Sequence, residues 1–236
     1  MKKVVFESDA SLASFAADMV QKQIESKPDS ILGLATGSTP LGLYKELIDR
    51  NLDFSKVTAF NLDEYYPIQK TDDQSYAYFM KENLFKHINI RPEHCFIPNG
   101  EAKDADAECK RYDELLEAYG GVDLQILGLG ENGHIGFNEP DSELVAGTHK
   151  TGLTESTIQA NARFFESIDQ VPTAALTMGM RTIFSAKKII VLVTGKKKHD
   201  IVHRLFEQGI TTNNPASLLQ LHPDVTVLVD TAAEEG

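Results

Sequence analysis

Two kinds of apolar pattern alternate along the chain. Short, continuous apolar runs, which are typical of strands buried on both faces, occupy residues 3–6, 30–36, 57–61, 95–97, 124–127, 188–194 and 225–229. Between them, apolar residues recur at intervals of three and four, as they do on one face of a helix. This second pattern predicts helices over residues 9–24, 40–48, 75–84, 102–119, 171–180, 196–206 and 215–221.

The alternation of strands and helices predicts an α/β fold. We expect a single Rossmann-like, three-layer domain over residues 1–236, with a largely parallel sheet of about seven strands and helices on both faces. Two segments lack a clear pattern. The polar stretch 141–162 is typical of a lid or binding segment, and the acidic tail 231–236 is expected to fray.

Charge narrows the range of partners. The chain of 236 residues is 42% hydrophobic and has a net charge of −12. An acidic protein is repelled by nucleic acid and by anionic membrane surfaces, so neither is expected as a partner. A small anionic substrate is still allowed, because a site can be locally basic.

Other features of the sequence bear on location. Cys95 and Cys109 form neither a disulfide framework nor a Cys-x-x-Cys motif, which fits two thiols in a reducing compartment. Residues 1–6 lack the apolar region of a signal peptide, and no apolar run reaches the about 18 residues of a membrane helix. The expected location is therefore the cytoplasm.

The strongest candidate site follows the apolar run 124–127. Four glycines, at positions 128, 130, 133 and 136, surround Asn132 and His134, and Glu139 follows. A glycine-rich loop at the carboxyl end of a strand is where open α/β sheets bind ligands. An imidazole near a carboxylate is a plausible proton-transfer pair at neutral pH. A structural turn with an incidental histidine is the alternative.

Two further strand ends carry polar residues. Gly37, Ser38 and Thr39 precede a helix, with Thr39 as the expected N-cap and Pro40 as the first helical residue. Amides and hydroxyls at such a helix start can hold a phosphate, although an ordinary capped turn is also possible. The loop has neither the Gly-Lys-Ser/Thr of a nucleotide-binding P-loop nor a Gly-x-Gly-x-x-Gly motif, so a small phosphorylated ligand is favoured.

The third strand end carries Asp63 and Glu64, which lead into a loop expected to close at Pro67. Adjacent side chains point in different directions, so one carboxylate is expected to face the site and the other to be structural. A solvated charge pair is the alternative. In the following helix, Tyr76 is expected to face inward.

Four motifs together resemble the glucosamine-6-phosphate deaminase family. They are Ala-Thr-Gly-Ser-Thr-Pro at 35–40, Asn-Leu-Asp-Glu-Tyr at 61–65, Gly-Leu-Gly-Glu-Asn-Gly-His-Ile-Gly-Phe-Asn-Glu-Pro at 128–140, and Ala-Leu-Thr-Met-Gly at 175–179. The resemblance covers essentially the whole chain, and the long third motif is highly specific. It implies an enzyme that turns glucosamine 6-phosphate and water into fructose 6-phosphate and ammonia, without a metal or cofactor.

The resemblance also implies residue roles. Asp63 matches the general base, and His134 and Glu139 match the ring-opening pair. Some members have Asp where this chain has Asn132; a neutral amide cannot stabilise an imidazolium as a carboxylate does, but it can orient the ring by a hydrogen bond. The implied phosphate-binding residues are Gly37, Ser38, Thr39, Arg163 and Lys198.

Two other functions are also compatible with an α/β fold of this kind. A 6-phosphogluconolactonase-type hydrolase would share the fold, but the Phe-Asn-Glu-Pro segment argues against it. A non-catalytic sugar-phosphate sensor is disfavoured by the full set of acid–base residues. The short chain after residue 229 resembles the short bacterial members, which predicts a monomer or small homo-oligomer.

Overall fold

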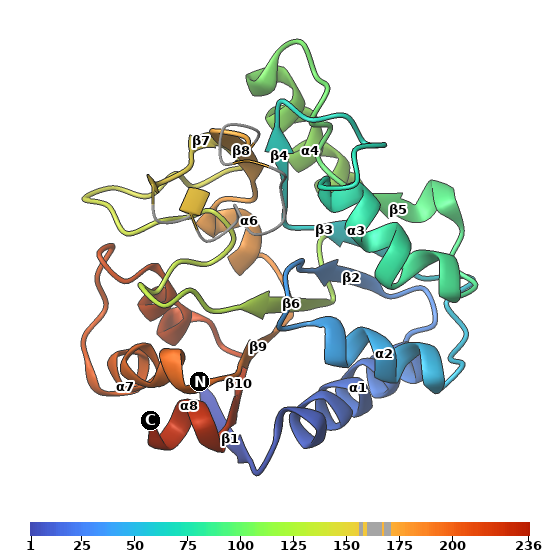
Figure 1. The fold of residues 1–236 in the computed structure, drawn as a ribbon. Coiled ribbons are helices and arrows are strands. Elements are labelled where there is room, and N and C mark those ends of the chain that lie inside the picture. Colours follow the sequence, from blue (N-terminus) through green and yellow to red (C-terminus); the bar gives the residue numbers. More distant parts are fainter. Residues whose placement is uncertain (156–157, 160–166, 168–170) are drawn as a thin grey trace.

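A parallel sheet forms the centre of the protein. The computed structural model describes residues 1–155, 158–159, 167 and 171–236. Within these residues, seven strands pair in parallel in the order β1 (Lys2–Phe6), β10 (Val225–Asp230), β9 (Lys188–Val193), β6 (Leu124–Gly128), β2 (Ile31–Leu34), β3 (Thr58–Asn61), β5 (Cys95–Phe96) (Figure 1). All seven predicted strands are confirmed, with ends that differ by a few residues.

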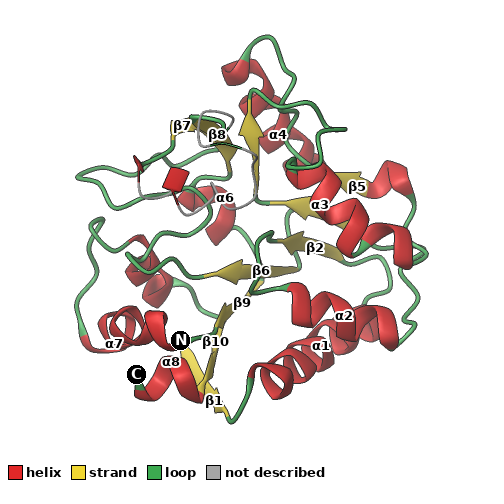
Figure 2. Cartoon of the chain, in the orientation of Figure 1, coloured by secondary structure: helices red, strands yellow, loops and turns green. Residues whose placement is uncertain are grey.

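Helices cover both faces of this sheet (Figure 2). One face carries α1 (Asp9–Ser26), α2 (Leu41–Asp49) and α3 (Tyr76–Asn83). The other carries α4 (Ala105–Ala118), α6 (Met180–Phe184), α7 (His199–Glu207) and α8 (Thr231–Glu235), with the 3₁₀ helix η6 (Pro215–Leu221). Shorter 3₁₀ turns are η1 (Phe85–His87), η2 (Pro92–His94) and η5 (Lys196–Lys198). The predicted three-layer α/β fold is thus confirmed.

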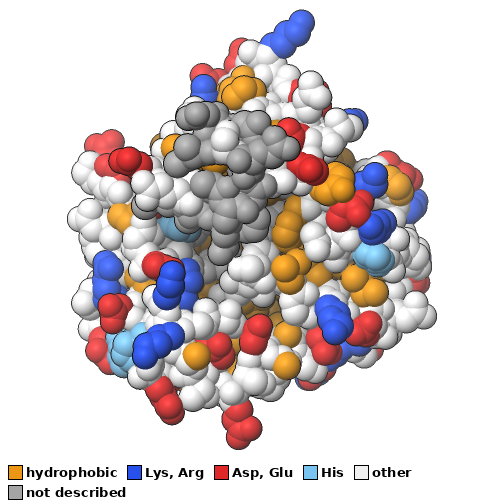
Figure 3. All heavy atoms as spheres, viewed as in Figure 1, with side chains coloured by type: hydrophobic (Ala, Val, Ile, Leu, Met, Phe, Trp, Pro, Cys, Tyr) orange, Lys and Arg blue, Asp and Glu red, His pale blue; other side chains and the backbone are white. Residues whose placement is uncertain are grey.

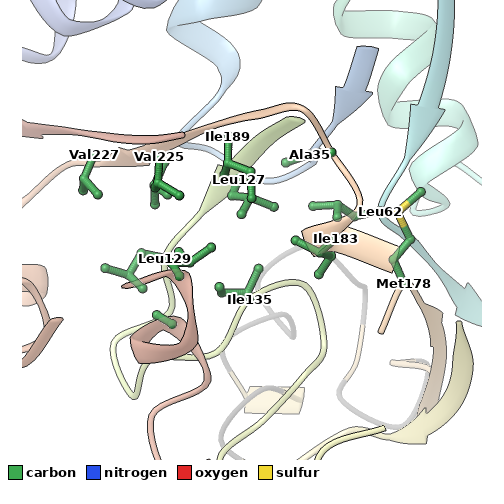
Figure 4. Close-up of a cluster of buried hydrophobic side chains, with 14 of the residues drawn as sticks. Ala35, Leu62, Leu127, Leu129, Ile135, Met178, Ile183, Ile189, Val225 and Val227 are labelled. Atoms are coloured by element: carbon green, nitrogen blue, oxygen red, sulfur yellow. The ribbon is translucent and has the colours of Figure 1, made fainter. Parts of the chain in front are cut away.

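Strand alternation divides the core into two layers. Ile190 and Leu192 of β9 pack with the layer under α1 and α2, whereas Ile189 and Val191 pack with the opposite layer. Both faces of a central parallel strand are buried, which explains the unbroken apolar runs in the sequence. Figure 4 shows how the second layer joins β9 and β10 to Leu129 and Ile135, which follow β6.

A small antiparallel sheet lies apart from the central one. It consists of β4 (Asp63–Tyr66), β8 (Ala174–Thr177) and β7 (His149–Gly152), in that order. Three expectations are wrong here: 63–66 is a strand and not a loop, 174–177 is a strand and not part of a helix, and the patternless stretch contains β7. Pairing between these distant segments overrides the helix propensity of Ala174 to Leu176.

Two helix ends also differ from expectation. Helix α2 begins at Leu41, with Pro40 at its N-cap and no side-chain cap bond, so Thr39 is not the cap. The acidic tail forms α8, because the Asp230 carboxylate accepts a 2.8 Å hydrogen bond from the amide of Ala233. Among the described residues, no helix combines the length and apolarity needed to cross a membrane.

The strand order places a crevice between β2 and β6. From β2 the chain continues to β3 and β5 on one side, while from β6 it continues to β9 and β10 on the other. The loops that follow β2 and β6 therefore diverge at the carboxyl edge of the sheet. Ligands bind open α/β sheets at such a switch point.

Phe60, near the carboxyl end of β3, lies in a buried group of aromatic rings. Its side chain is fully buried, and its ring lies 4.8 Å from that of Phe96 and 5.7 Å from that of Tyr112. We predict that Phe60→Ala lowers the free energy of unfolding by about 3–5 kcal/mol, because it leaves a cavity among these rings. Urea denaturation measures this change. Leu221→Ala is the control: its side chain is 67% exposed, so its change should stay within about 0.5 kcal/mol.

Candidate active site

A cleft of about 810 Å³ opens at the predicted edge of the sheet. It brings together the loop after β2, the junction of β3 and β4, the start of α3, the loop after β6 and the start of α7. The lining residues are Ala35, Thr36, Thr39, Leu62, Asp63, Tyr76, Gly128, Leu129, Gly130, Glu131, Asn132, His134, Gly136, Phe137, Gln159, Lys197 and Lys198. Figure 3 shows acidic and basic side chains interspersed over one face of the molecule.

Glycines let the loop after β6 fold tightly around His134. A methyl group on Gly130 would lie 2.4 Å from the Nδ1 atom of His134, so only a glycine leaves room for the imidazole. Gly133 has a φ of +96°, which disfavours other residues. Leu129 and Ile135, on either side, are buried in the core (Figure 4). The loop is therefore anchored at both ends while His134 remains partly exposed in the cleft.

His134, Glu139 and Asn132 form a connected group. The His134 Nδ1 atom lies 3.4 Å from the Glu139 Oε2 atom, an ion-pair distance once the ring is protonated. Asn132 donates a 2.7 Å hydrogen bond to the same Glu139 oxygen, and its Oδ1 accepts a 3.1 Å bond from the His134 amide. Asn132 thus orients the carboxylate and the loop backbone, and not the imidazole as the sequence analysis expected.

Asp63 lies at the bottom of the cleft. Its side chain is 6% exposed, and burial, followed by the charge of Glu64, raises the pKa of Asp63 to about 8. Gly136 approaches closely: a methyl group there would be 3.3 Å from the Asp63 Oδ2 atom. The amide of Phe137 donates a 3.1 Å bond to Thr177, the partner of Asp63 in the β4–β8 pairing. These contacts fix the His134 loop next to Asp63.

The expected division between Asp63 and Glu64 is confirmed. Asp63 lines the cleft, whereas Glu64 faces away and accepts hydrogen bonds from the amides of Tyr65, Tyr76 and Ala77. Because side chains alternate along β4, the two carboxyl groups lie on opposite sides of one strand.

Two of the predicted phosphate-binding residues line the cleft. Thr39 and Lys198 both line it, while Gly37 and Ser38 lie on the exposed part of the same loop as Thr39. Gly37 has a φ of +91°, which lets the loop turn out of β2. Burial lowers the pKa of Lys198, and the charge of Glu131 opposes this effect. Arg163 lies outside the described residues.

Several cleft residues were not singled out by the sequence. Tyr76 was expected to face the core, yet its ring stacks 6.1 Å from that of Phe137 and lines the cleft. Its place near the start of the helix predicted to begin at residue 75 was the available signal. Thr36, Glu131, Gln159 and Lys197 gave no distinctive signal. Among the described residues, no group of three or more His, Cys, Asp and Glu side chains is arranged to hold a metal ion.

Sequence comparisons point to one family. Residues 7–228 match the family described as glucosamine-6-phosphate isomerases/6-phosphogluconolactonase. A glucosamine-6-phosphate deaminase of Clostridium beijerinckii is 51% identical over 234 residues, which cover 98% of this chain and 97% of the relative. One of Thermoanaerobacter pseudethanolicus is 50% identical over 237 residues, covering 99% and 94%.

Structural comparisons agree with these matches. The solved structure of a monomeric glucosamine-6-phosphate deaminase superposes with a TM-score of 0.97 at 47% identity, covering 100% of this chain and 99% of the other. A 6-phosphogluconolactonase of Thermotoga maritima superposes with a TM-score of 0.77 at 21% identity, covering 97% and 98%. The second likeness concerns the fold alone.

The buried Asp63 carboxyl predicts a pH-dependent stability. Between about pH 4 and pH 8 the folded protein holds a proton on Asp63 that the unfolded chain has lost, so this group makes stability fall as the pH rises. Asp63→Asn removes the effect. We expect its melting temperature, relative to the unchanged protein, to increase by roughly 7–15 °C between pH 5 and pH 8.

Differential scanning calorimetry at several pH values measures this difference. Asp29→Asn is the control, because Asp29 is exposed and its difference should not change with pH. A difference for Asp63→Asn that is independent of pH would show that Asp63 ionises as it does in the unfolded chain.

Proposed function

The chain belongs to the family of glucosamine-6-phosphate isomerases and 6-phosphogluconolactonases, and we propose that it converts glucosamine 6-phosphate and water into fructose 6-phosphate and ammonia. One observation carries the proposal: a buried carboxyl, an imidazole next to a carboxylate and a half-buried lysine share one cleft. Isomerisation needs the first two groups for proton transfer, and a phosphorylated substrate needs the third.

His134 opens the sugar ring in this mechanism. Its imidazole takes the proton of the anomeric hydroxyl and delivers it to the ring oxygen, so the ring bond breaks and an aldehyde forms. Glu139 stabilises the imidazolium from 3.4 Å, and Asn132 holds the Glu139 carboxylate in place. The Nδ1 atom has no aligned hydrogen bond among the described residues, and we expect this contact to tighten when substrate binds.

Asp63 carries out the isomerisation. Its carboxylate removes the proton from carbon 2, which gives an enolamine, and returns it to carbon 1. Water then adds to the resulting imine, and ammonia leaves. The amino group of the substrate sits on carbon 2, and its positive charge favours the ionised form of Asp63 in the complex. These steps transfer only protons and water, so we propose that no metal or cofactor takes part.

The phosphate is held at the far end of the cleft. We assign it to the amides and hydroxyls of Gly37, Ser38 and Thr39 and to the ammonium of Lys198, with Arg163 as a fifth candidate. Anchoring the phosphate there places carbons 1 and 2 near Asp63 and reduces the entropy lost on reaching the transition state. A bound phosphate also offsets the burial of the Lys198 charge.

The proposal also covers the oligomeric state and the cellular location of the protein. The relative with 47% identity is described as monomeric, and we propose that residues 1–236 likewise act as a single-domain monomer in the cytoplasm. The molar mass measured by light scattering tests the oligomeric state. The mass of a dimer would contradict the proposed monomer.

Asp63→Asn is the first test of the mechanism. We expect turnover to fall roughly 10²- to 10⁴-fold, because the general base is lost. Ammonia and fructose 6-phosphate are both measured, and Asp29→Asn is the control. Near-normal turnover in Asp63→Asn would remove Asp63 from the mechanism. If the unchanged protein made neither product but hydrolysed 6-phosphogluconolactone, the proposed activity itself would be wrong.

Substitutions of the lysines that precede α7 test the proposed phosphate site. We expect Lys198→Ala to raise the KM for glucosamine 6-phosphate roughly 10- to 100-fold, because a hydrogen bond to a charged group contributes about 1.5–3 kcal/mol. Lys196→Ala is the matched control, since Lys196 is exposed and does not line the cleft. Equal effects of the two substitutions on KM would indicate a general charge effect and not a specific contact.

A further inference from the structure

Glu64 is a buried carboxylate that takes no part in the proton transfers of the proposed mechanism. Its side chain is 2% exposed and lies on the opposite side of β4 from Asp63. There it borders a second cavity, of about 550 Å³, which is also lined by Ala77, Cys95 and Glu101. A carboxylate buried so deeply needs strong hydrogen bonds to stay ionised.

The hydrogen bonds come mainly from helix α3. Glu64 Oε1 accepts from the Tyr76 amide at 2.8 Å, and Oε2 accepts from the Ala77 amide at 2.9 Å. These are the first two amides of α3, which have no acceptor within the helix. The third amide, of Tyr78, is capped by Ser75. Oε1 also accepts from the Tyr65 amide at 2.9 Å.

These bonds connect two walls of the cleft. Strand β4 carries Asp63, and the first residue of α3 is Tyr76, whose ring borders the same cleft. The strand and the helix lie side by side (Figure 1), and Glu64 bonds to the backbone of both. The position of Tyr76 relative to Asp63 therefore depends on Glu64.

Glu64 also affects Asp63 electrostatically. Burial raises the pKa of Glu64 to about 7, while the three amide donors oppose this rise. Burial raises the pKa of Asp63 to about 8, and the Glu64 charge is the second cause. The three amide donors favour the ionised form of Glu64, and its charge then opposes the ionisation of Asp63.

Three buried phenols also interact electrostatically with Asp63. The phenols of Tyr44 on α2, Tyr76 on α3 and Tyr112 on α4 all have pKa values raised by burial. They are uncharged near neutral pH. Among the described residues, the other titratable groups that line the cleft are Glu131, His134, Lys197 and Lys198, and Glu139 lies next to His134.

We propose that Glu64 is a positioning residue for Asp63: its carboxylate holds the start of α3 against β4 and keeps a negative charge beside the base. Glu64 itself exchanges no proton with the substrate. The negative charge makes the ionised Asp63 a stronger base for carbon 2, and the fixed helix keeps Tyr76 at the cleft. This inference rests on the proposed role of Asp63 as the base.

Glu64→Gln tests the electrostatic part. The amide keeps the shape of the side chain but removes its charge. We expect the acid limb of the pH profile of kcat/KM to move about one pH unit toward low pH, since the Glu64 charge is the second cause of the raised Asp63 pKa and a nearby unit charge contributes on this scale. Glu101→Gln is the matched control, because it removes an exposed carboxylate from the same second cavity without touching α3. An unmoved limb in folded Glu64→Gln would overturn the electrostatic part.

Glu64→Asp tests the positioning part. It keeps the charge but is one methylene too short to reach all three amides. We expect an acid limb close to that of the unchanged protein and a kcat lowered roughly 10-fold or more, because a small misplacement of reacting groups is costly. A normal kcat would overturn the positioning part. A merely structural residue would lower the melting temperature in both variants without moving the limb in Glu64→Gln.

The pH dependence of stability tests the proposal without a measurement of catalysis. In a Glu64→Gln background, the pH at which the stability gained by Asp63→Asn levels off should fall below about 8, because Asp63 then ionises more readily in the folded protein. An unchanged pH dependence would contradict the proposal. If Asp63→Asn retained turnover, the assignment of the base would fail instead, so the two failures can be told apart.

Discussion

The burial of one ionisable carboxyl governs the design of this site. Asp63 sits almost out of water at the end of a sheet, where an ionised group is costly. A fold selected only for stability would place an apolar residue there. The surroundings instead leave room for the carboxyl: Gly136 keeps the facing loop close without a side chain, and the neighbouring phenols remain uncharged. Two extensive apolar layers offset the cost of burying this carboxyl.

The two layers also explain how a glycine-rich loop can hold a reactive imidazole in place. Leu129 and Ile135 belong to the same core cluster as the strands β6, β9 and β10. The segment between them carries His134 and lines the cleft. Within it, the amide of Gly130 bonds to the carbonyl of His134 at 3.0 Å, so the loop closes on itself. The conformational freedom of glycine is thereby used to shape the loop and not to make it mobile.

Much of this arrangement was predictable because it is encoded locally. The apolar runs identified the seven strands of the main sheet, and the alternation of side chains predicted that Asp63 and Glu64 would divide into one site residue and one structural residue. The small sheet was not predictable in the same way. Its strand β4 pairs Asp63 with Thr177, and β7 pairs His149 with the same residue, so the signal lies in contacts between distant segments. The contact of Asn132 with Glu139 depends likewise on how the loop folds back, which periodicity does not reveal.

The pairing of β1 with β10 has a consequence for biosynthesis. Lys2 lies opposite Thr226, and Lys3 also forms an ion pair with Glu234, so the first strand made is among the last to find its partner. While the chain is being synthesised, this strand waits with unpaired backbone groups until nearly all other residues have left the ribosome. Its two lysines discourage premature pairing with another chain during that interval. The sheet can therefore be completed at this edge only after residues 225–230 have been made.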